Sequence, residues 1–258
     1  MKTLLLLLVT IGLAACDISK QSRALVVGMD LSYPPFETID SSGKPAGVSV
    51  DLAEAFGKWI GRPVRIENIP FVGLIPALKS GRIDMIISSM TDTPERRQSV
   101  SFSDPYLTIG LALLCRPGTS LTSPSDLDLP SRTLAVRQGT TGEAWARGHL
   151  QHARILVLDK ESSAVSEVMQ GRADAFLYDQ MSVWQNWQRH QKKTIALLTP
   201  VQTEHWAVAL RKGDDALRQK VNEFLRDFRA KGGFEILGDR YLKEQKDAFR
   251  QRGIPFYF

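Results

Sequence analysis

The feature that most constrains the fold is an alternation of strands and helices that occurs twice. Apolar runs and helical periodicity give the order βαβαβ at residues 23–28, 50–60, 64–66, 73–80 and 85–87. The same order recurs at residues 133–136, 142–150, 155–158, 162–170 and 175–177. The segment Gly-Arg-Ile-Asp-Met at 81–85 also resembles Gly-Arg-Ala-Asp-Ala at 171–175. We therefore expect two similar α/β lobes, each a mostly parallel sheet flanked by helices.

The C-terminal part of the chain has no partner lobe of its own. It contains an apolar strand at 206–210, followed by a helix with apolar residues on one face. We assign this part to lobe 1. The predicted boundaries are 24–112 and 203–258 for lobe 1, and 113–202 for lobe 2. The chain then crosses between the lobes twice, near 111–116 and 199–206, which suits a two-segment hinge.

The N-terminus has the layout of a secretory signal peptide. Lys2 precedes an apolar run at residues 4–13, and small residues then lead to Cys16. The run is shorter than the roughly 20 apolar residues that span a bilayer, so we expect residues 1–15 to be cleaved. Leu-Ala-Ala-Cys at 13–16 resembles a bacterial lipobox, which implies lipidation of Cys16 and a membrane tether at 16–23. Asp17 resembles a signal that retains lipoproteins on the periplasmic side of the inner membrane.

The composition is that of an ordinary globular protein and argues against a nucleic-acid-binding or a metal-dependent protein. The 33 Lys and Arg residues are interspersed with 28 acidic ones, so the formal charge of +5 gives no clustered surface for nucleic acid. With Cys16 lipidated, only Cys115 remains; no internal disulfide is expected, and this thiol is predicted to be buried. The four histidines form no helical metal-binding pair and common catalytic motifs are missing, so we expect no metal and no cofactor.

Strand ends indicate where a ligand would bind. Sheets of parallel strands bind ligands beyond the carboxyl ends of their strands. The predicted strands lead to four such segments, which are Asp30 with Tyr33, residues 88–96, residues 139–142, and Asp179. If the lobes face each other, all four segments line one cleft, which is the predicted ligand site.

Residues 88–96, Ser-Ser-Met-Thr-Asp-Thr-Pro-Glu-Arg, are the most informative segment. Hydroxyl groups come at a strand end, and a helix then starts with Thr93 as its cap and Pro94 in its first turn. Arg96 follows one turn into the helix. Helix-start amides and a guanidinium offer several fixed donors to a carboxylate. The same local pattern fits a capped surface helix with a solvated arginine, so it leaves both interpretations open.

This segment resembles the signature of the family-3 solute-binding proteins, the polar amino-acid receptors of ABC importers. Residues 28–37, Gly-Met-Asp-Leu-Ser-Tyr-Pro-Pro-Phe-Glu, resemble the opening motif of that family. Residues 102–106, Phe-Ser-Asp-Pro-Tyr, resemble the segment after its arginine. The match extends from about residue 24 to residue 245 with the order intact. The resemblance implies the two-lobed periplasmic-binding-protein fold of type II.

The resemblance also implies roles for individual residues. Arg96 would form a bidentate bond with the α-carboxylate of a ligand, and Thr91 and Thr141 would add hydroxyl or amide donors. Asp179 would hold the α-ammonium group, helped by the Thr91 hydroxyl and a main-chain carbonyl near Ser89. The predicted ligand-binding residues of these segments are Ser88, Ser89, Thr91, Arg96, Thr141 and Asp179.

Asp30, Tyr33, Phe36 and Phe71 are predicted to form the pocket for the ligand side chain. A carboxylate beside aromatic rings accepts from a cationic or amide group, and the rings cover alkyl parts. Phe36 and Phe71 fit the core equally well. Gly142 stands where some receptors for basic amino acids carry a longer polar residue, which weakens the case for lysine or arginine. Asp30 disfavours acidic ligands by like-charge repulsion.

From the sequence we predict a monomeric, extracytoplasmic solute-binding lipoprotein rather than an enzyme. It would bind a polar or basic free amino acid and deliver it to an ABC permease in the inner membrane. Two alternatives stay open. A periplasmic dehydratase of the cyclohexadienyl type resembles these receptors, but it uses acids in the cleft for elimination and would turn over prephenate or arogenate. A detached sensory receptor would need a signalling partner.

Overall fold

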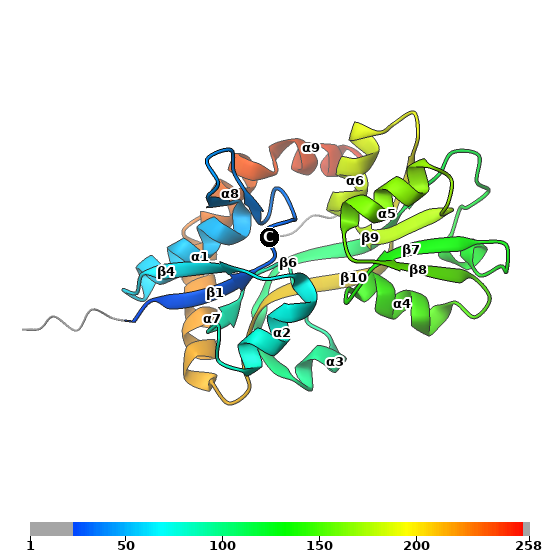
Figure 1. The fold of residues 1–258 in the computed structure, drawn as a ribbon. Coiled ribbons are helices and arrows are strands. Elements are labelled where there is room, and N and C mark those ends of the chain that lie inside the picture. Colours follow the sequence, from blue (N-terminus) through cyan, green and yellow to red (C-terminus); the bar gives the residue numbers. More distant parts are fainter. Residues whose placement is uncertain (1–22, 255–258) are drawn as a thin grey trace, which may run out of the picture.

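The computed structural model describes residues 23–254. The predicted signal peptide, Cys16 and residues 255–258 lie outside the described residues. In the described range an eight-stranded sheet has the order β4-β1-β5-β10-β6-β9-β7-β8. The strands β4, β1 and β5 are parallel at one end, and β9, β7 and β8 are parallel at the other. Each end is covered by helices, which gives the predicted two-lobed α/β fold (Figure 1).

Lobe 1 follows the predicted order of elements. Its elements are β1 (Leu25–Met29), β2 (Thr38–Ile39), β3 (Pro45–Ala46), α1 (Val48–Trp59), β4 (Val64–Asn68), α2 (Phe71–Lys79), β5 (Met85–Ile86) and α3 (Pro94–Arg97). All five residues of β1 are buried, because both faces of this strand are covered. Leu25 and Val27 face one apolar core, and Val26 faces the other. The sequence order βαβαβ is therefore confirmed for this lobe.

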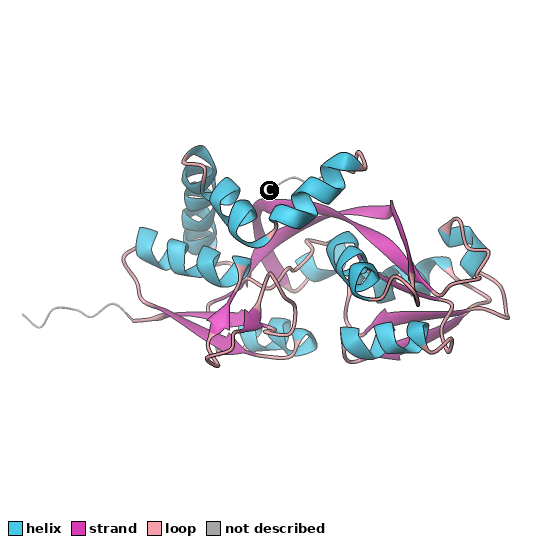
Figure 2. Cartoon of the chain, turned by 90° about the horizontal axis from the view of Figure 1, so that it is seen from above, coloured by secondary structure: helices cyan, strands magenta, loops and turns pink. Residues whose placement is uncertain are grey.

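Lobe 2 repeats the plan. It begins with a short 3-10 helix, η1 (Pro124–Leu127). Its further elements are β7 (Thr133–Arg137), α4 (Thr141–His149), β8 (Arg154–Leu158), α5 (Glu161–Met169), β9 (Ala175–Asp179) and α6 (Gln180–Arg189). Leu134 and Val136 face one core, whereas Ala135 faces the other, as the two-residue period of a strand requires. Figure 2 shows helices on both sides of the strands in each half of the molecule.

Two long antiparallel strands connect the lobes. They are β6 (Val100–Cys115) and β10 (Ile195–Arg211). In lobe 1, Ala209 and Leu210 of β10 pair with β5, and in lobe 2 the segment 111–115 of β6 pairs with β9. Cys115 is buried at the lobe 2 end of β6, as the sequence predicts. The residue boundaries of the two lobes stay a prediction.

The C-terminal helices return to lobe 1. They are α7 (Asp215–Ala230), α8 (Gly233–Tyr241) and α9 (Lys243–Gln251). Phe224 of α7 packs on Phe56 of α1, with ring centroids 5.3 Å apart. Helix α9 then extends toward α6, where Phe249 meets Trp184 edge to face (Figure 1). Among residues 23–254, no helix has the length and apolar character needed to cross a membrane.

Candidate functional site

A small cavity lies between the lobes, where the carboxyl ends of β1, β5, β7 and β9 converge. Parallel strands of both lobes end here, and the adjoining segments supply most of the lining. The lining residues are Asp30, Tyr33, Glu37, Phe71, Ser88, Ser89, Thr91, Arg96, Leu111, Arg137, Thr140, Thr141, Tyr178, Asp179, Glu204 and Trp206. Polar and charged groups dominate this list, so the cavity suits a small polar ligand.

Arg96 is held in place by the short helix α3. The Thr93 side chain accepts from the backbone N–H of Arg96 at 3.2 Å, and Pro94 occupies the first turn, as the sequence predicts. The guanidinium donates to the carbonyl of Thr91 at 2.7 Å and, across the cleft, to the carbonyl of Gly139 at 3.1 Å. It also lies 5.4 Å from the ring centre of Phe71. These contacts fix a partly buried cation whose pKa is lowered from its ordinary value by desolvation.

Glu204 lies at the same end of the cavity and is a residue that the sequence reasoning missed. This carboxyl is 3% exposed and accepts from the Thr91 hydroxyl at 3.0 Å. Burial raises its pKa, whereas hydrogen bonds from Thr141 and Thr91 and the charge of Arg96 act in the opposite direction. Two of the groups predicted to bind a carboxylate, Thr91 and Thr141, therefore already donate to one, and the charge of Arg96 acts on the same carboxyl.

Asp179 provides an acceptor on the opposite lobe. It is the N-cap of α6 and accepts from the backbone N–H of Ser182 at 3.0 Å. Its other contact crosses the cleft, where the Tyr33 hydroxyl donates at 2.6 Å. Burial raises the pKa of Asp179 to about 7, although these two hydrogen bonds lower it. Glu161 and Glu204 raise it further by repulsion.

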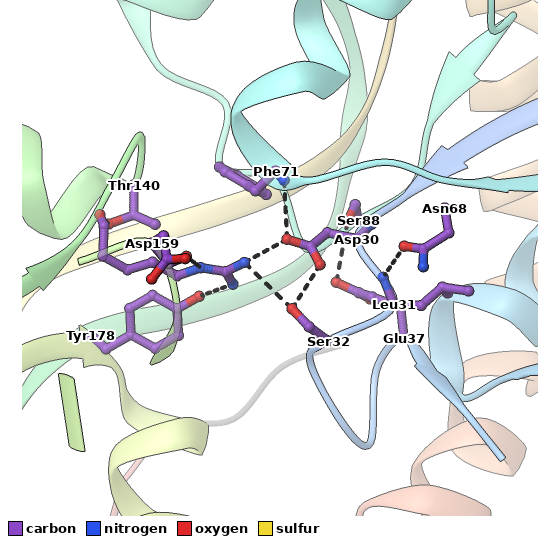
Figure 3. A network of polar contacts seen from close by, with 11 residues as sticks. Asp30, Leu31, Ser32, Glu37, Asn68, Phe71, Ser88, Thr140, Asp159 and Tyr178 are labelled. Carbon is purple, nitrogen blue, oxygen red and sulfur yellow. Dashed lines mark hydrogen bonds and ion pairs between the residues drawn. The ribbon is translucent and has the colours of Figure 1, made fainter. Parts of the chain in front are cut away.

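Asp30 forms a buried ion pair with Arg137, another residue that the sequence reasoning missed. The guanidinium of Arg137, at the end of β7, donates to Asp30 at 2.5 Å and to the Tyr178 hydroxyl at 3.2 Å. Asp30 also accepts from the hydroxyl of Ser32 and the backbone N–H of Phe71 (Figure 3). The pair joins lobe 1 to lobe 2 at the predicted side-chain end of the cavity.

Glu37 lines the cavity beside this pair. Its carboxyl accepts from the hydroxyls of Ser49 at 2.6 Å and Ser89 at 3.2 Å. Burial raises the pKa of Glu37 to about 8, and the charge of Asp30 raises it further, although the serine hydrogen bonds lower it. Ser89 has a φ of 49°, a left-handed conformation that few residues other than glycine adopt. Unusual backbone of this kind is common at binding sites.

The structure brings most of the predicted site residues together. The cavity is lined by Asp30, Tyr33, Phe71, Ser88, Ser89, Thr91, Arg96, Thr141 and Asp179. Phe36 is different, because it is fully buried behind the lining and stacks on Tyr33 at a centroid distance of 5.4 Å. Trp206 lines the cavity instead of Phe36 and packs edge to face on it. The prediction placed Phe36 in the pocket, and the structure places it in the core.

Some lining residues carried a signal in the sequence that was not used. Arg137 comes directly after the predicted strand 133–136, and Tyr178 directly before Asp179. Both therefore sit at strand ends that already marked the cleft. Glu204 gave no comparable signal, because it lies inside a crossing strand.

Comparison with known proteins identifies the family. The model of the bacterial extracellular solute-binding proteins, family 3, matches residues 25–244. The chain belongs to this family. The match covers both lobes and every cavity-lining residue, so the family assignment applies to the whole site.

The relatives of this family-3 protein bind amino acids. It is 27% identical over 223 residues to the L-cystine-binding protein TcyJ of Escherichia coli, covering 86% of this chain and 84% of TcyJ. It is 31% identical over 225 residues to the L-arginine-binding protein of Pseudomonas aeruginosa, covering 84% and 86% of the two chains. Relatives at this similarity and coverage give the family-3 chain a solute-binding role.

A solved structure also resembles this family-3 chain. It is the ancestral amino acid-binding protein AncCDT-1, a precursor of cyclohexadienyl dehydratase, with a TM-score of 0.77 and 35% identity. The similarity covers 84% of this chain and 94% of AncCDT-1. The two-lobed architecture is therefore shared with amino-acid-binding proteins.

Proposed function

We propose that the protein captures a free amino acid with a polar or basic side chain and delivers it to an ABC permease in the inner membrane. The observation that carries this proposal is the placement of Arg96 and Asp179 on opposite lobes of one cavity. A zwitterion presents a carboxylate and an ammonium group, and these two residues offer a guanidinium cation and a carboxyl group that can accept from the ammonium. We further propose that Cys16 is lipidated and tethers a monomer on the periplasmic side of that membrane.

The chemistry of the cavity suits reversible capture. A hydrogen bond to a charged group contributes about 1.5–3 kcal/mol, so a few of them supply the roughly 8 kcal/mol of micromolar binding. A ligand held by Arg96 from lobe 1 and Asp179 from lobe 2 binds more tightly when the lobes are closed. Ligand binding thus favours the closed arrangement by its differential affinity, and this is the form that the permease would receive.

A periplasmic dehydratase is the second candidate. It is favoured by the similarity to AncCDT-1 and by two cavity acids whose pKa values burial raises to near neutral pH. Burial raises the pKa of Asp179 to about 7 and that of Glu37 to about 8, values that suit general acids. AncCDT-1 is itself an amino acid-binding protein, and the other two relatives are binding proteins, so capture is the stronger proposal.

The proposal predicts that Arg96→Ala weakens amino-acid binding by about 100-fold or more, because two charge-assisted hydrogen bonds to the ligand carboxylate are lost. The neighbouring Arg97 is the matched control, since its side chain is 63% exposed and pairs with Asp92 away from the cavity. Isothermal titration of both variants measures the effect. Tight binding by Arg96→Ala, or equal losses in both variants, contradicts the site assignment.

A further inference from the structure

The acceptor atoms of Asp30 are already occupied. One oxygen accepts from the Ser32 hydroxyl at 2.6 Å, and the other accepts from the backbone N–H of Phe71 at 3.0 Å and from Arg137. A carboxylate has about four lone-pair positions, so three of them have partners here. The side chain is only 10% exposed, and that of Arg137 is 7% exposed, so both partners of the ion pair are buried. Figure 3 shows the contacts of Asp30. Arg137 therefore already occupies most of the capacity of Asp30 to pair with a ligand cation.

Arg137 is held in this position by contacts with both lobes. Its guanidinium also donates to the Tyr178 hydroxyl at 3.2 Å, and to the carbonyl of Asp159 and the Ser32 hydroxyl at 3.4 Å each. Its centre lies 5.9 Å from the ring centre of Phe71. With contacts to both lobes, the side chain cannot leave Asp30 without losing several partners.

The other carboxyl at this end does not replace Asp30 as a cation acceptor. Glu37 lines the cavity, but its carboxyl accepts from Ser49, Ser89 and Ser88. Burial raises its pKa to about 8, so it is mostly protonated at pH 7. The negative charge of Asp30 and the positive charge of Arg137 cancel, which leaves the side-chain end of the cavity with no net charge.

We propose that Arg137 determines side-chain specificity by neutralising Asp30, so that the cavity selects amino acids with uncharged side chains. This inference rests on the proposed function and narrows its polar or basic ligands to the uncharged ones. A cationic side chain would meet a guanidinium at close range in a poorly solvated site, where like charges repel strongly. An anionic side chain would have to take Arg137 from Asp30 and leave a buried carboxylate unpaired.

The contacts also favour a particular uncharged group. Arg137 has five N–H donors. Its four hydrogen bonds are to Asp30, Ser32, Tyr178 and Asp159, and the bonds to Asp30 and Ser32 come from the same nitrogen. One donor is left beyond these four bonds, and Arg137 lines the cavity together with Phe71 and Tyr178. A side chain with a flat alkyl-and-carbonyl end, such as a carboxamide or a ureido group, combines an acceptor for this donor with surface for the rings.

The test compares binding of charged and uncharged ligands by isothermal titration. The purified protein is titrated with the standard amino acids and with citrulline, which has the shape of arginine without its charge. The tightest ligand is expected to have an uncharged side chain, and arginine and lysine are expected to bind about tenfold more weakly or worse. Arg137→Met is expected to gain about tenfold or more in arginine affinity, because it exposes the Asp30 carboxylate to a ligand cation.

Two further variants assign the effect to the ion pair. Arg137→Lys keeps the positive charge and is expected to keep the discrimination against arginine. The double variant Arg137→Met with Asp30→Asn contains no unpaired buried charge, and is expected to fold and to lose the gain. If Arg137→Met does not fold, the inference is tested by the wild-type ligand panel together with the Arg137→Lys and double variants.

The inference and the proposed function fail in different ways. Wild-type protein that binds arginine or lysine as tightly as any uncharged amino acid overturns the inference but leaves amino-acid capture in place. The same holds if a folded Arg137→Met variant gains no cation affinity, or if an acidic amino acid binds most tightly. Wild-type protein that binds no amino acid contradicts the proposed function itself.

Discussion

The acidic residues of the cleft differ in how readily they ionise, because each has a different degree of burial and different hydrogen-bond partners. Asp30 is paired with Arg137, whereas Asp179 has only a phenol and a backbone N–H as partners. Burial therefore raises the pKa of Asp179 to about 7. In the ligand-free protein, this carboxyl is mostly protonated below that pH. A ligand ammonium bound there, as proposed, would favour the carboxylate, so binding below pH 7 is expected to release a proton.

Amino-acid affinity is accordingly expected to rise as the pH increases from 5 to 7, by up to about 100-fold, and to level off above pH 8. Titrations in two buffers of different ionisation enthalpy at pH 6 should show the released proton. Asp179→Asn cannot ionise, so this variant should bind more weakly and lose most of the pH dependence. Equal dissociation constants at pH 5 and pH 8 in the wild type would contradict the role of Asp179.

The sequence located the site residues better than it described their states. Asp30 and Asp179 were placed in the cleft because they follow predicted strands, and that rule depends only on local pattern. The partner of Asp30 is 107 residues further along the chain, on the other lobe. No local pattern reports such a contact, so the sequence suggested an acceptor for cations where the structure has a neutral pair.

Individual elements position the site through their ends. The turn between β7 and α4 contains Gly139, whose φ of 74° is left-handed and whose carbonyl accepts from Arg96. A Cβ at this position would lie 2.7 Å from a methyl carbon of Val72 in α2, across the cleft. The absence of a side chain at Gly139 thus lets lobe 2 approach lobe 1 beside Arg96.

Gly139→Ala is therefore expected to weaken ligand binding by about tenfold or more as well as to lower stability by about 1 kcal/mol, because the clash with Val72 opposes closure. Gly171 is the matched control: it is also left-handed, with a φ of 71°, but has open space around it. Gly171→Ala should lose similar stability and keep its affinity. Titration and thermal unfolding of both variants separate the two effects, and equal affinities would refute the role of the turn.

The short elements were predictable and the long strands were not. Repeated apolar runs with flanking glycines gave both βαβαβ units, because these elements follow simple periodicities. The strands β6 and β10 contain Pro105 and Pro200, which in a sequence indicate a break in a strand. In the structure the ladder between these strands has irregular register at both points, so each proline is tolerated. The sequence predicted that the chain crosses between the lobes twice, but not that the two crossing segments are continuous strands that pair in one sheet.

The whole molecule is two lobes that meet at their polar faces. Across the cleft, Tyr33 donates to Asp179, Arg96 donates to Gly139, and Arg137 pairs with Asp30. These contacts hold the lobes in a closed arrangement, and β6 and β10 are the two connections that a hinge motion would bend. A zwitterion bound between Arg96 and Asp179, as proposed, would add charge-assisted contacts to both lobes at once. The arrangement of the whole molecule therefore supports the proposed capture of a free amino acid.

The measurement that tests this claim most directly is isothermal titration of the purified protein, stripped of any carried ligand, against the standard amino acids and prephenate. We expect saturable binding of at least one amino acid with an uncharged polar side chain, with a dissociation constant of about micromolar or tighter. No turnover heat is expected from prephenate. Continuous heat from prephenate, or no binding of any amino acid, would contradict amino-acid capture and favour the dehydratase or a sensory receptor.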